Sequence, residues 1–175
     1  MNRRRGNSVR IRPALGFDQA DKCLILILIG LPARGKTFLA HKINRYFAWL
    51  GYNSQIFAVN EKKNETAELQ LNELTDFFLF KNGDIGIYDD TNTTIQDRLI
   101  IQQHLQQKQE HHKWKIIYIE SIVTKQEILD FHFKLDIPET NMTENEAMKR
   151  YHTRLQSLKE SYKHIHEDEF ITNHI

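Results

Sequence analysis

The stretch "CLILILIGLPARGKT", residues 23 to 37, decides the fold of this chain. An unbroken apolar run closed by a glycine is typical of a strand that is buried on both faces, as in a parallel sheet. The residues that follow the run match the pattern G-x-x-x-x-G-K-[ST] without a mismatch. In such a loop the glycines let successive backbone N–H groups point at phosphate oxygens, and the positive end of the next helix adds to the attraction.

The loop therefore predicts a cradle for the phosphates of ATP, with Mg²⁺ as the accompanying ion. Lys36 can reach the β- and γ-phosphates, and the Thr37 hydroxyl can ligate Mg²⁺. The nucleotide-binding residues that we predict are Gly30, Leu31, Pro32, Ala33, Arg34, Gly35, Lys36 and Thr37.

The rest of the chain alternates short apolar runs with segments of helical periodicity. We predict further strands over 55–59, 84–89 and 115–121, and helices over 36–50, within 60–82, over 95–113, after Thr124 and after Thr143. This alternation favours βαβ crossovers. We therefore predict an α/β fold of three layers, the P-loop NTPase fold, with a mostly parallel central sheet flanked by helices.

A second candidate site lies in "IGIYDD", residues 85 to 90. A carboxylate at the end of a buried strand beside the cradle is where Mg²⁺ bound to a nucleotide needs a charged ligand. We predict Asp89 as this ligand, with Asp90 as the less favoured alternative. The plain structural interpretation is that "DDTN" forms a turn.

Composition places the chain among ordinary globular proteins. With 175 residues, 40% of them hydrophobic, and a net charge of +1, we expect one domain over 21–175 after a basic, flexible arm over 1–20. The single Cys23, the short apolar runs and the lack of a signal-peptide pattern near Met1 predict a cytoplasmic protein. The helices lack a basic stripe, so we expect no nucleic-acid partner. The net charge of +1 and the short apolar runs lead us to expect no membrane partner either. Trp49 and Trp114 are expected in the core.

The cradle and the segment "YDDTNTT" (Tyr88 to Thr94) together resemble the kinase domain of 6-phosphofructo-2-kinase/fructose-2,6-bisphosphatase, whose family carries GLPARGKT and a DATNTT-like segment. Three later stretches are similar to the family as well: "YIESIV", "FKLDIP" and "AMKRYHTRLQSLKESY". The resemblance runs from about Leu24 to about Tyr162. It predicts a shortened kinase domain that lacks the C-terminal part of the family domain and has no phosphatase domain.

The resemblance implies ATP-dependent phosphorylation of fructose 6-phosphate at its 2-hydroxyl, a step that regulates fructose metabolism. The partner would be a small sugar phosphate. Lys36, Asp89 and Lys134 would be catalytic, with Asp89 ligating the metal or assisting the attacking hydroxyl, and Lys134 beside the phosphates or the substrate. The substrate would contact Thr91, Arg98, Lys134 and Arg154, with Arg154 pairing with the 6-phosphate.

The chain also departs from the family's pattern. The family's Glu-Tyr-Arg-Arg-Glu reads "EKKNE" here (Glu61 to Glu65), and Ile95 and Asp97 stand at arginine positions. Arginine binds phosphate through two parallel hydrogen bonds, so these changes weaken the predicted acceptor site but leave the nucleotide cradle intact. Two alternatives therefore stay open: a non-catalytic ATP-binding module, or a kinase for another small hydroxyl substrate.

Overall fold

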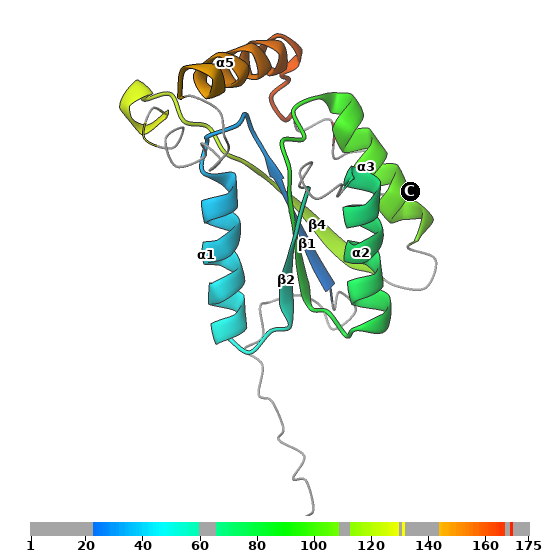
Figure 1. Ribbon diagram of the computed structural model, residues 1–175. Helices are drawn as coiled ribbons and strands as arrows, with labels where there is room; N and C mark the ends of the chain where they lie inside the picture. The colour runs from blue at the N-terminus through cyan, green and yellow to red at the C-terminus, as the bar shows by residue number, and fades with distance from the viewer. Residues whose placement is uncertain are drawn as a thin grey trace, which may run out of the picture.

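The computed structural model describes residues 23–59, 66–108, 113–129, 131, 144–166 and 169, and within them strands and helices alternate along the chain (Figure 1). The elements are β1 (Cys23–Ile29), α1 (Lys36–Trp49), β2 (Ser54–Ala58), α2 (Ala67–Phe80), β3 (Ile85–Asp89), α3 (Ile95–Gln107), β4 (Trp114–Glu120) and α5 (Glu144–Ser161). Residues 126–129 are helical as well. The predicted arm over 1–20 lies outside the described residues.

The four strands form one parallel sheet in the order β2-β3-β1-β4. The apolar run of β1 is therefore covered by a strand on each side, as its composition predicts. Leu28 of β1 stands opposite Asp89 of β3, and Ile29 stands opposite Glu120 of β4. The carboxyl ends of these strands consequently meet at one edge of the sheet. The predicted parallel α/β fold is confirmed.

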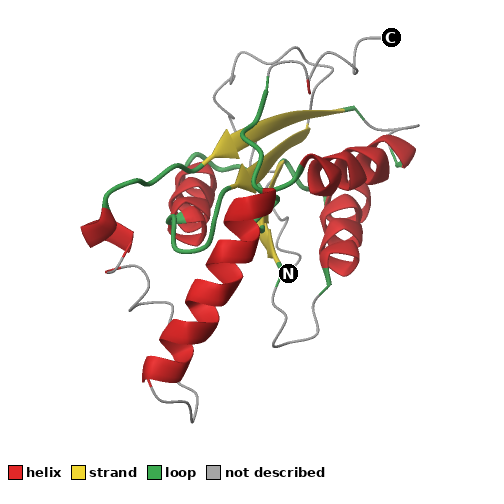
Figure 2. Ribbon diagram, turned by 90° about the horizontal axis from the view of Figure 1, so that it is seen from above, coloured by secondary structure: helices red, strands yellow, loops and turns green. Residues whose placement is uncertain are grey.

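Alternate residues of β1 supply two separate cores. Ile25, Ile27 and Ile29 join the cluster built with α2 and α3, whereas Leu24, Leu26 and Leu28 join the cluster built with α1. This division follows from the two-residue side-chain period of a strand. Figures 1 and 2 show the resulting layers, with α1 on one face of the sheet and α2 and α3 on the other.

The C-terminal helix α5 lies across the carboxyl end of the sheet instead of joining either layer (Figure 1). Its Leu155 is buried. The segment after α5 returns to the domain: the Lys163 N–H donates to the carbonyl oxygen of Thr93 at 3.0 Å, and Ile165 packs against the core. The described residues 162–166 therefore lie at the same edge where the strands end.

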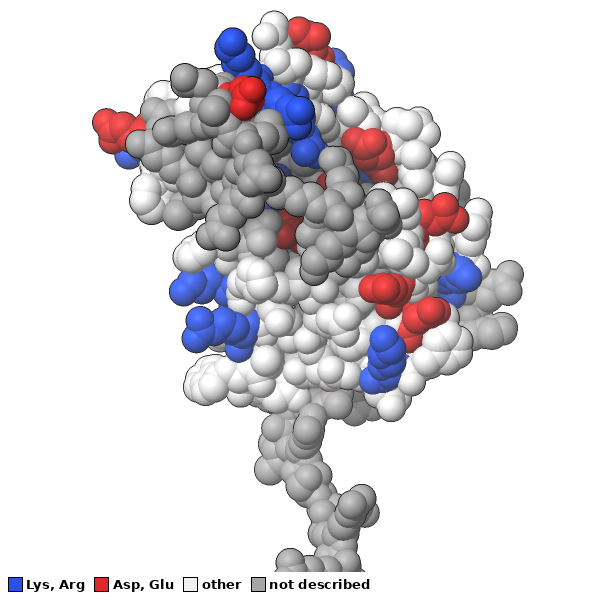
Figure 3. All heavy atoms as spheres, in the orientation of Figure 1, with Lys and Arg blue, Asp and Glu red and all other residues white. Residues whose placement is uncertain are grey.

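The outer face of α1 is aromatic and basic. Phe38, Tyr46 and Trp49 are exposed, and the Lys42 ammonium lies 5.1 Å from the centre of the Phe38 ring. Figure 3 shows basic side chains along this side of the molecule. The expectation that Trp49 lies in the core is wrong, since 80% of it is exposed, whereas Trp114 is buried as expected. None of the helices in the described part of the chain has the length and apolar character needed to cross a membrane.

Candidate active site

The loop between β1 and α1 turns sharply at the end of the sheet, and glycine permits its path at two positions. Gly30 has a φ of 147°, and a Cβ on it would lie 2.7 Å from the backbone oxygen of Ser121. Gly35, just before α1, has a φ of 77°. Residues with a Cβ rarely adopt these angles. Ala33, at φ 56°, adds a strained position of the kind that collects at functional sites.

The strand β4 supports this loop from one side. The Ser121 N–H donates to the Ile29 carbonyl oxygen at 2.8 Å, and the Ser121 hydroxyl donates to the Arg34 carbonyl oxygen at 2.6 Å. One residue thus holds both ends of the loop. These two hydrogen bonds hold the loop between Gly30 and Gly35 against the end of β4.

Lys36 and Thr37 begin α1 at the mouth of the loop. Lys36 is 8% exposed, and its ammonium donates to the Leu31 carbonyl oxygen at 2.9 Å, so it turns back over its own loop. Thr37 is exposed, and its side chain forms a hydrogen bond with Asp89 of the neighbouring strand β3. The cradle and the strand-end carboxylate predicted from sequence therefore come together in the fold.

Asp89 is a buried carboxylate with a cation beside it. Only 6% of the residue is exposed, and this burial raises the pKa of Asp89, while the Thr37 hydrogen bond and the Lys36 ammonium act in the opposite direction. A hydroxyl and a carboxylate are the oxygen ligands that Mg²⁺ prefers. The donor set at Thr37 and Asp89 therefore fits the ion that the sequence predicts, although their role as ligands stays a prediction.

The segment after β3 is fastened to β1. The Gly30 N–H donates to the Thr91 carbonyl oxygen at 3.0 Å, and the Asn92 side-chain amide donates to the Leu28 carbonyl oxygen at 2.8 Å. Asn92 is buried and has a φ of 47°. Asparagine tolerates this left-handed conformation better than most residues. These contacts fix Thr91 next to the phosphate cradle.

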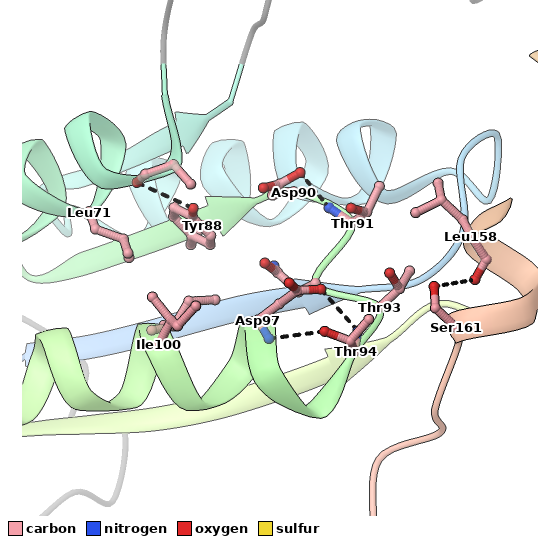
Figure 4. Close-up of a pocket in the computed structure, with 13 residues that line it drawn as sticks. Leu71, Tyr88, Asp90, Thr91, Thr93, Thr94, Asp97, Ile100, Leu158 and Ser161 are labelled. Atoms are coloured by element: carbon pink, nitrogen blue, oxygen red, sulfur yellow. Dashed lines mark hydrogen bonds between the residues drawn. The ribbon is translucent and has the colours of Figure 1, made fainter. Parts of the chain in front are cut away.

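A cavity of about 340 Å³ opens beside this segment, between β3, α3 and the end of α5 (Figure 4). Its polar lining consists of Asp90, Thr91, Asn92, Thr93, Thr94, Asp97 and Ser161, and its apolar lining of Ala67, Leu71, Tyr88, Ile100, Ile101 and Leu158. Thr91, which the sequence predicts as a substrate contact, therefore faces a cavity of suitable size. Pockets for small molecules begin at roughly 300 Å³.

Asp90 and Asp97 are the two acidic groups of the cavity lining, and each is fixed by the backbone. Asp90 accepts a hydrogen bond from the Thr91 N–H at 2.7 Å. Asp97 forms a capping box with Thr94, each side chain accepting from the other residue's N–H at 3.0 Å. Burial raises the pKa of Asp90, the Thr91 N–H and the Lys36 ammonium act in the opposite direction, and the acidic neighbours Asp89 and Asp97 add to the increase.

Arg98, a predicted substrate contact, is buried and bound to other parts of the chain. Its Nε and Nη2 atoms donate to the Glu169 carboxylate at 2.7 and 2.8 Å, and Nη1 donates to the carbonyl oxygens of Asn92 and Lys163, each at 3.2 Å. Four of its five N–H groups are thus engaged. Arg98 does not line the cavity, and in this arrangement it joins the C-terminal segment to α3.

A second, smaller cavity of about 230 Å³ lies on the β4 side of the cradle. It is lined by Leu31, Arg34, Ser121, Ile122, Val123, Thr124, Tyr162 and His164. Glu120 accepts hydrogen bonds from Tyr162 and from His164, the latter at 2.9 Å, and so holds the C-terminal segment at this cavity. The cradle therefore has a cavity on each side.

The other residues predicted from the sequence do not line either cavity in the described part of the chain. Arg154 is exposed on α5, one turn before the cavity residue Leu158. Lys134 lies outside the described residues, as does the segment "EKKNE". The sequence did not predict that Ser121 and Asn92 hold the site together through hydrogen bonds to the backbone. It also did not predict that Asp97 caps α3 at the cavity, although the pattern T-x-x-D in "TIQD" is a recognisable capping signal.

Comparison with solved structures supports the fold. A structure described as a fungal RNA kinase superposes with a TM-score of 0.58 at 16% identity, covering 84% of this chain and 70% of that one. The structure of APE1195 superposes with a TM-score of 0.55 at 18% identity, covering 82% of this chain and 80% of that one. At these identities the likeness concerns the fold alone.

Comparison of sequences gives curated relatives of one kind. The chain is 26% identical to a 6-phosphofructo-2-kinase/fructose-2,6-bisphosphatase of Arabidopsis thaliana over 86% of its own length, and 27% identical to isoform 4 of Rattus norvegicus over 90%. It is 28% identical to a probable 6-phosphofructo-2-kinase of Schizosaccharomyces pombe over 82%. The chain spans only 23%, 40% and 29% of these three relatives, respectively.

The family model described as 6-phosphofructo-2-kinase matches residues 14–69 and 58–174, most of the chain. The matched range contains the cradle, the strand-end carboxylate and both cavities. Motif, fold and family match thus agree, and the chain belongs to the 6-phosphofructo-2-kinase family.

Proposed function

We propose that this chain transfers the γ-phosphoryl group of ATP to a hydroxyl group of a small molecule. The observation that carries the proposal is the convergence of Lys36, Thr37 and Asp89 where β1 and β3 end. Phosphoryl transfer needs mainly positioning and charge stabilisation, and these residues are of the types that provide both. Family membership supports the same reaction class.

The roles of the residues follow from their positions. The backbone N–H groups of the loop from Gly30 to Gly35 would hold the phosphates, and Lys36 would place its charge on the transferred group. Thr37 and Asp89 would hold Mg²⁺, which when bound neutralises charge on the phosphate oxygens. The cavity beside Arg34 and Ser121 would accept the nucleoside, and the cavity beside Thr91 would accept the hydroxyl compound.

Fructose 6-phosphate is the acceptor that the family suggests, with fructose 2,6-bisphosphate as the product. It is therefore the first acceptor to test. The lining of the acceptor cavity favours a second class of acceptor, which is treated in the next subsection. A chain that binds the nucleotide without transferring its phosphoryl group would be a non-catalytic module.

The test uses the purified chain with Mg²⁺, ATP labelled in the γ-position, and a panel of phosphorylated and unphosphorylated sugars. We expect labelled product, and we expect Lys36→Met to abolish both product formation and tight ATP binding. Lys42→Met is the matched control, because Lys42 lies on the outer face of α1 against Phe38, away from the loop. ATP binding without transfer to any acceptor would refute the proposed function.

A further inference from the structure

The lining of the acceptor cavity does not have the chemistry of a phosphate site. Among the described residues, its charged groups are the carboxylates of Asp90 and Asp97, and neither a lysine nor an arginine lines it. A phosphate dianion placed there would face two like charges at short range in a partly buried setting, where water screens them poorly. The Lys36 ammonium, which acts on Asp90, does not line this cavity and donates to the Leu31 carbonyl oxygen of the cradle instead. Hydroxyl groups of a ligand, in contrast, would find carboxylate and threonine oxygens as hydrogen-bond partners.

The start of α3 is the place in this cavity where a phosphate could otherwise bind. The N-terminus of a helix carries unpaired N–H groups and a partial positive charge, and both attract anions. Here Asp97 supplies the anion itself: its Oδ2 atom accepts the Thr94 N–H at 3.0 Å, and the Asp97 N–H donates to the Thr94 hydroxyl. The Asp97 carboxylate therefore occupies the anion-binding position at the start of α3.

The arginine nearest this position is also withdrawn from the cavity. Arg98 follows Asp97 directly, but its guanidinium is bound to Glu169 and to two backbone carbonyl groups. It is 3% exposed. Turning it towards a ligand would break a bidentate charged pair and would leave Glu169 without these contacts, so this arrangement opposes recruitment of Arg98 by a phosphate.

The geometry points to an acceptor without a phosphate group: we infer that the cavity between β3, α3 and α5 takes a neutral or amine-bearing polyhydroxy compound of monosaccharide size. This inference rests on the proposed function, since it concerns the acceptor of the same transfer. Asp97 and Asp90 are its specificity-determining residues. They favour hydroxyl and ammonium groups and act against anionic ligands by repulsion, which is one of the two ways in which a site discriminates.

The cavity surfaces agree with this class of ligand. Asp90 and Thr91 stand on one side and Thr93, Asp97 and Ser161 on the other, as Figure 4 shows, so that hydrogen-bonding groups face the space from both sides. Leu71, Tyr88 and Leu158 add apolar surface to the same cavity. Such a mixture of a few polar groups with apolar walls is typical of small-molecule sites and suits the C–H faces of a sugar ring.

The test measures acceptor binding directly, by calorimetric titration of the full chain with Mg²⁺ and a non-hydrolysable ATP analogue. We compare the affinities for fructose and fructose 6-phosphate, which differ by the phosphate group. We also compare the affinities for glucosamine and glucose, where glucosamine carries an additional ammonium group. We expect fructose to bind at least about 10-fold more tightly than fructose 6-phosphate, and glucosamine more tightly than glucose, because of the two carboxylates. Equal or tighter binding of fructose 6-phosphate would overturn the inference, as would binding of none of the four sugars.

Replacing Asp97 tests whether its charge causes the preference for fructose over fructose 6-phosphate. Asp97→Asn removes the charge but keeps an oxygen that can accept the Thr94 N–H, and it should raise the affinity for fructose 6-phosphate relative to fructose about 10-fold. Asp76→Asn removes the same charge from the exposed face of α2 and should leave the ratio unchanged. An unchanged ratio in Asp97→Asn would refute the role of Asp97. The transfer assay with γ-labelled ATP tests the proposed function, whereas the titrations test which acceptor the cavity binds, so a failed proposed function and a failed acceptor inference give different results.

Discussion

The guanidinium of Arg98 and the carboxylate of Glu169, 71 positions apart in the chain, meet through two hydrogen bonds of 2.7 and 2.8 Å. This pair joins the first turn of α3 to the segment that follows α5. It also takes the arginine of "TIQDR" away from the acceptor cavity. One contact therefore influences both the stability of the C-terminal segment and the chemistry of the site.

We predict that Glu169→Gln lowers the free energy of unfolding at neutral pH by about 2 kcal/mol, in the range found for hydrogen bonds to charged groups. The Arg98 hydrogen bonds lower the pKa of Glu169, so their contribution is present above the usual glutamate range and is lost as the pH falls through the lowered pKa. The difference between the variant and the parent chain should therefore shrink in acid. Denaturant unfolding at several pH values measures it.

Glu160→Gln is the control for this prediction, because Glu160 is exposed on α5 and its replacement removes the same charge. It should change stability little at any pH. A Glu169→Gln variant as stable as the parent at neutral pH would show that the pair contributes nothing.

Gly30→Ala should destroy nucleotide binding, whereas Gly51→Ala should not. Both glycines have positive φ, but a Cβ on Gly30 would lie 2.7 Å from the Ser121 oxygen, while one on Gly51 would meet nothing within 4 Å. Each variant bears the strain of a left-handed residue, about 1–2 kcal/mol. Thermal unfolding with and without ATP would compare them, and an intact ATP-induced shift in Gly30→Ala would contradict the role of the loop.

Asp89→Asn should stabilise the ligand-free chain and weaken the dependence of ATP binding on Mg²⁺. Because burial raises the pKa of Asp89 in the folded state, its ionisation costs stability, and this cost appears as the pH rises through the raised pKa. The stability gained by the variant should therefore grow as the pH rises above the usual aspartate pKa of about 3.9. Thermal unfolding across this range checks the sign; a variant that loses stability as the pH rises would be evidence against it.

Thr94→Ala should lower the stability of the chain by about 1 kcal/mol, the usual effect of removing a helix N-cap. The Asp97 N–H would lose its acceptor, and the carboxylate would lose part of the geometry that fixes it at the cavity. Thr153→Ala is a suitable control, since the exposed Thr153 hydroxyl donates to the Lys149 carbonyl oxygen within α5. Equal effects of the two substitutions in denaturant unfolding would mean that the capping box adds no stability.

The layers of the fold and the cradle could be predicted because their signals are local. The apolar run of β1 and the spacing of Gly30, Gly35 and Lys36 each lie within a few residues. In a parallel sheet the carboxyl ends of neighbouring strands meet at one edge, and this places Asp89 of β3 opposite Leu28 of β1, beside the cradle. Local pattern and tertiary structure agree at these positions.

The chemistry of the acceptor site could not be predicted in the same way. Whether Arg98 reaches a ligand depends on Glu169, which is far away in sequence, and no periodicity links them. Resemblance to the family favoured a substrate role for this arginine, whereas the fold gives it internal partners. The prediction for Trp49 was wrong for a different reason. Two residues along a helix correspond to a rotation of about 200° about its axis. Because Phe47 packs on the sheet, Trp49 points away from it into solvent.

The contrast between Trp49 and Trp114 has a practical consequence for work in solution. One indole is 80% exposed at the end of α1, and the other is 5% exposed among the aromatic rings of the α2 core. Fluorescence from the two should separate into a red-shifted component that acrylamide quenches readily and a blue-shifted component that it does not reach. The single substitution Trp49→Phe would leave an emission that follows the melting of the core alone.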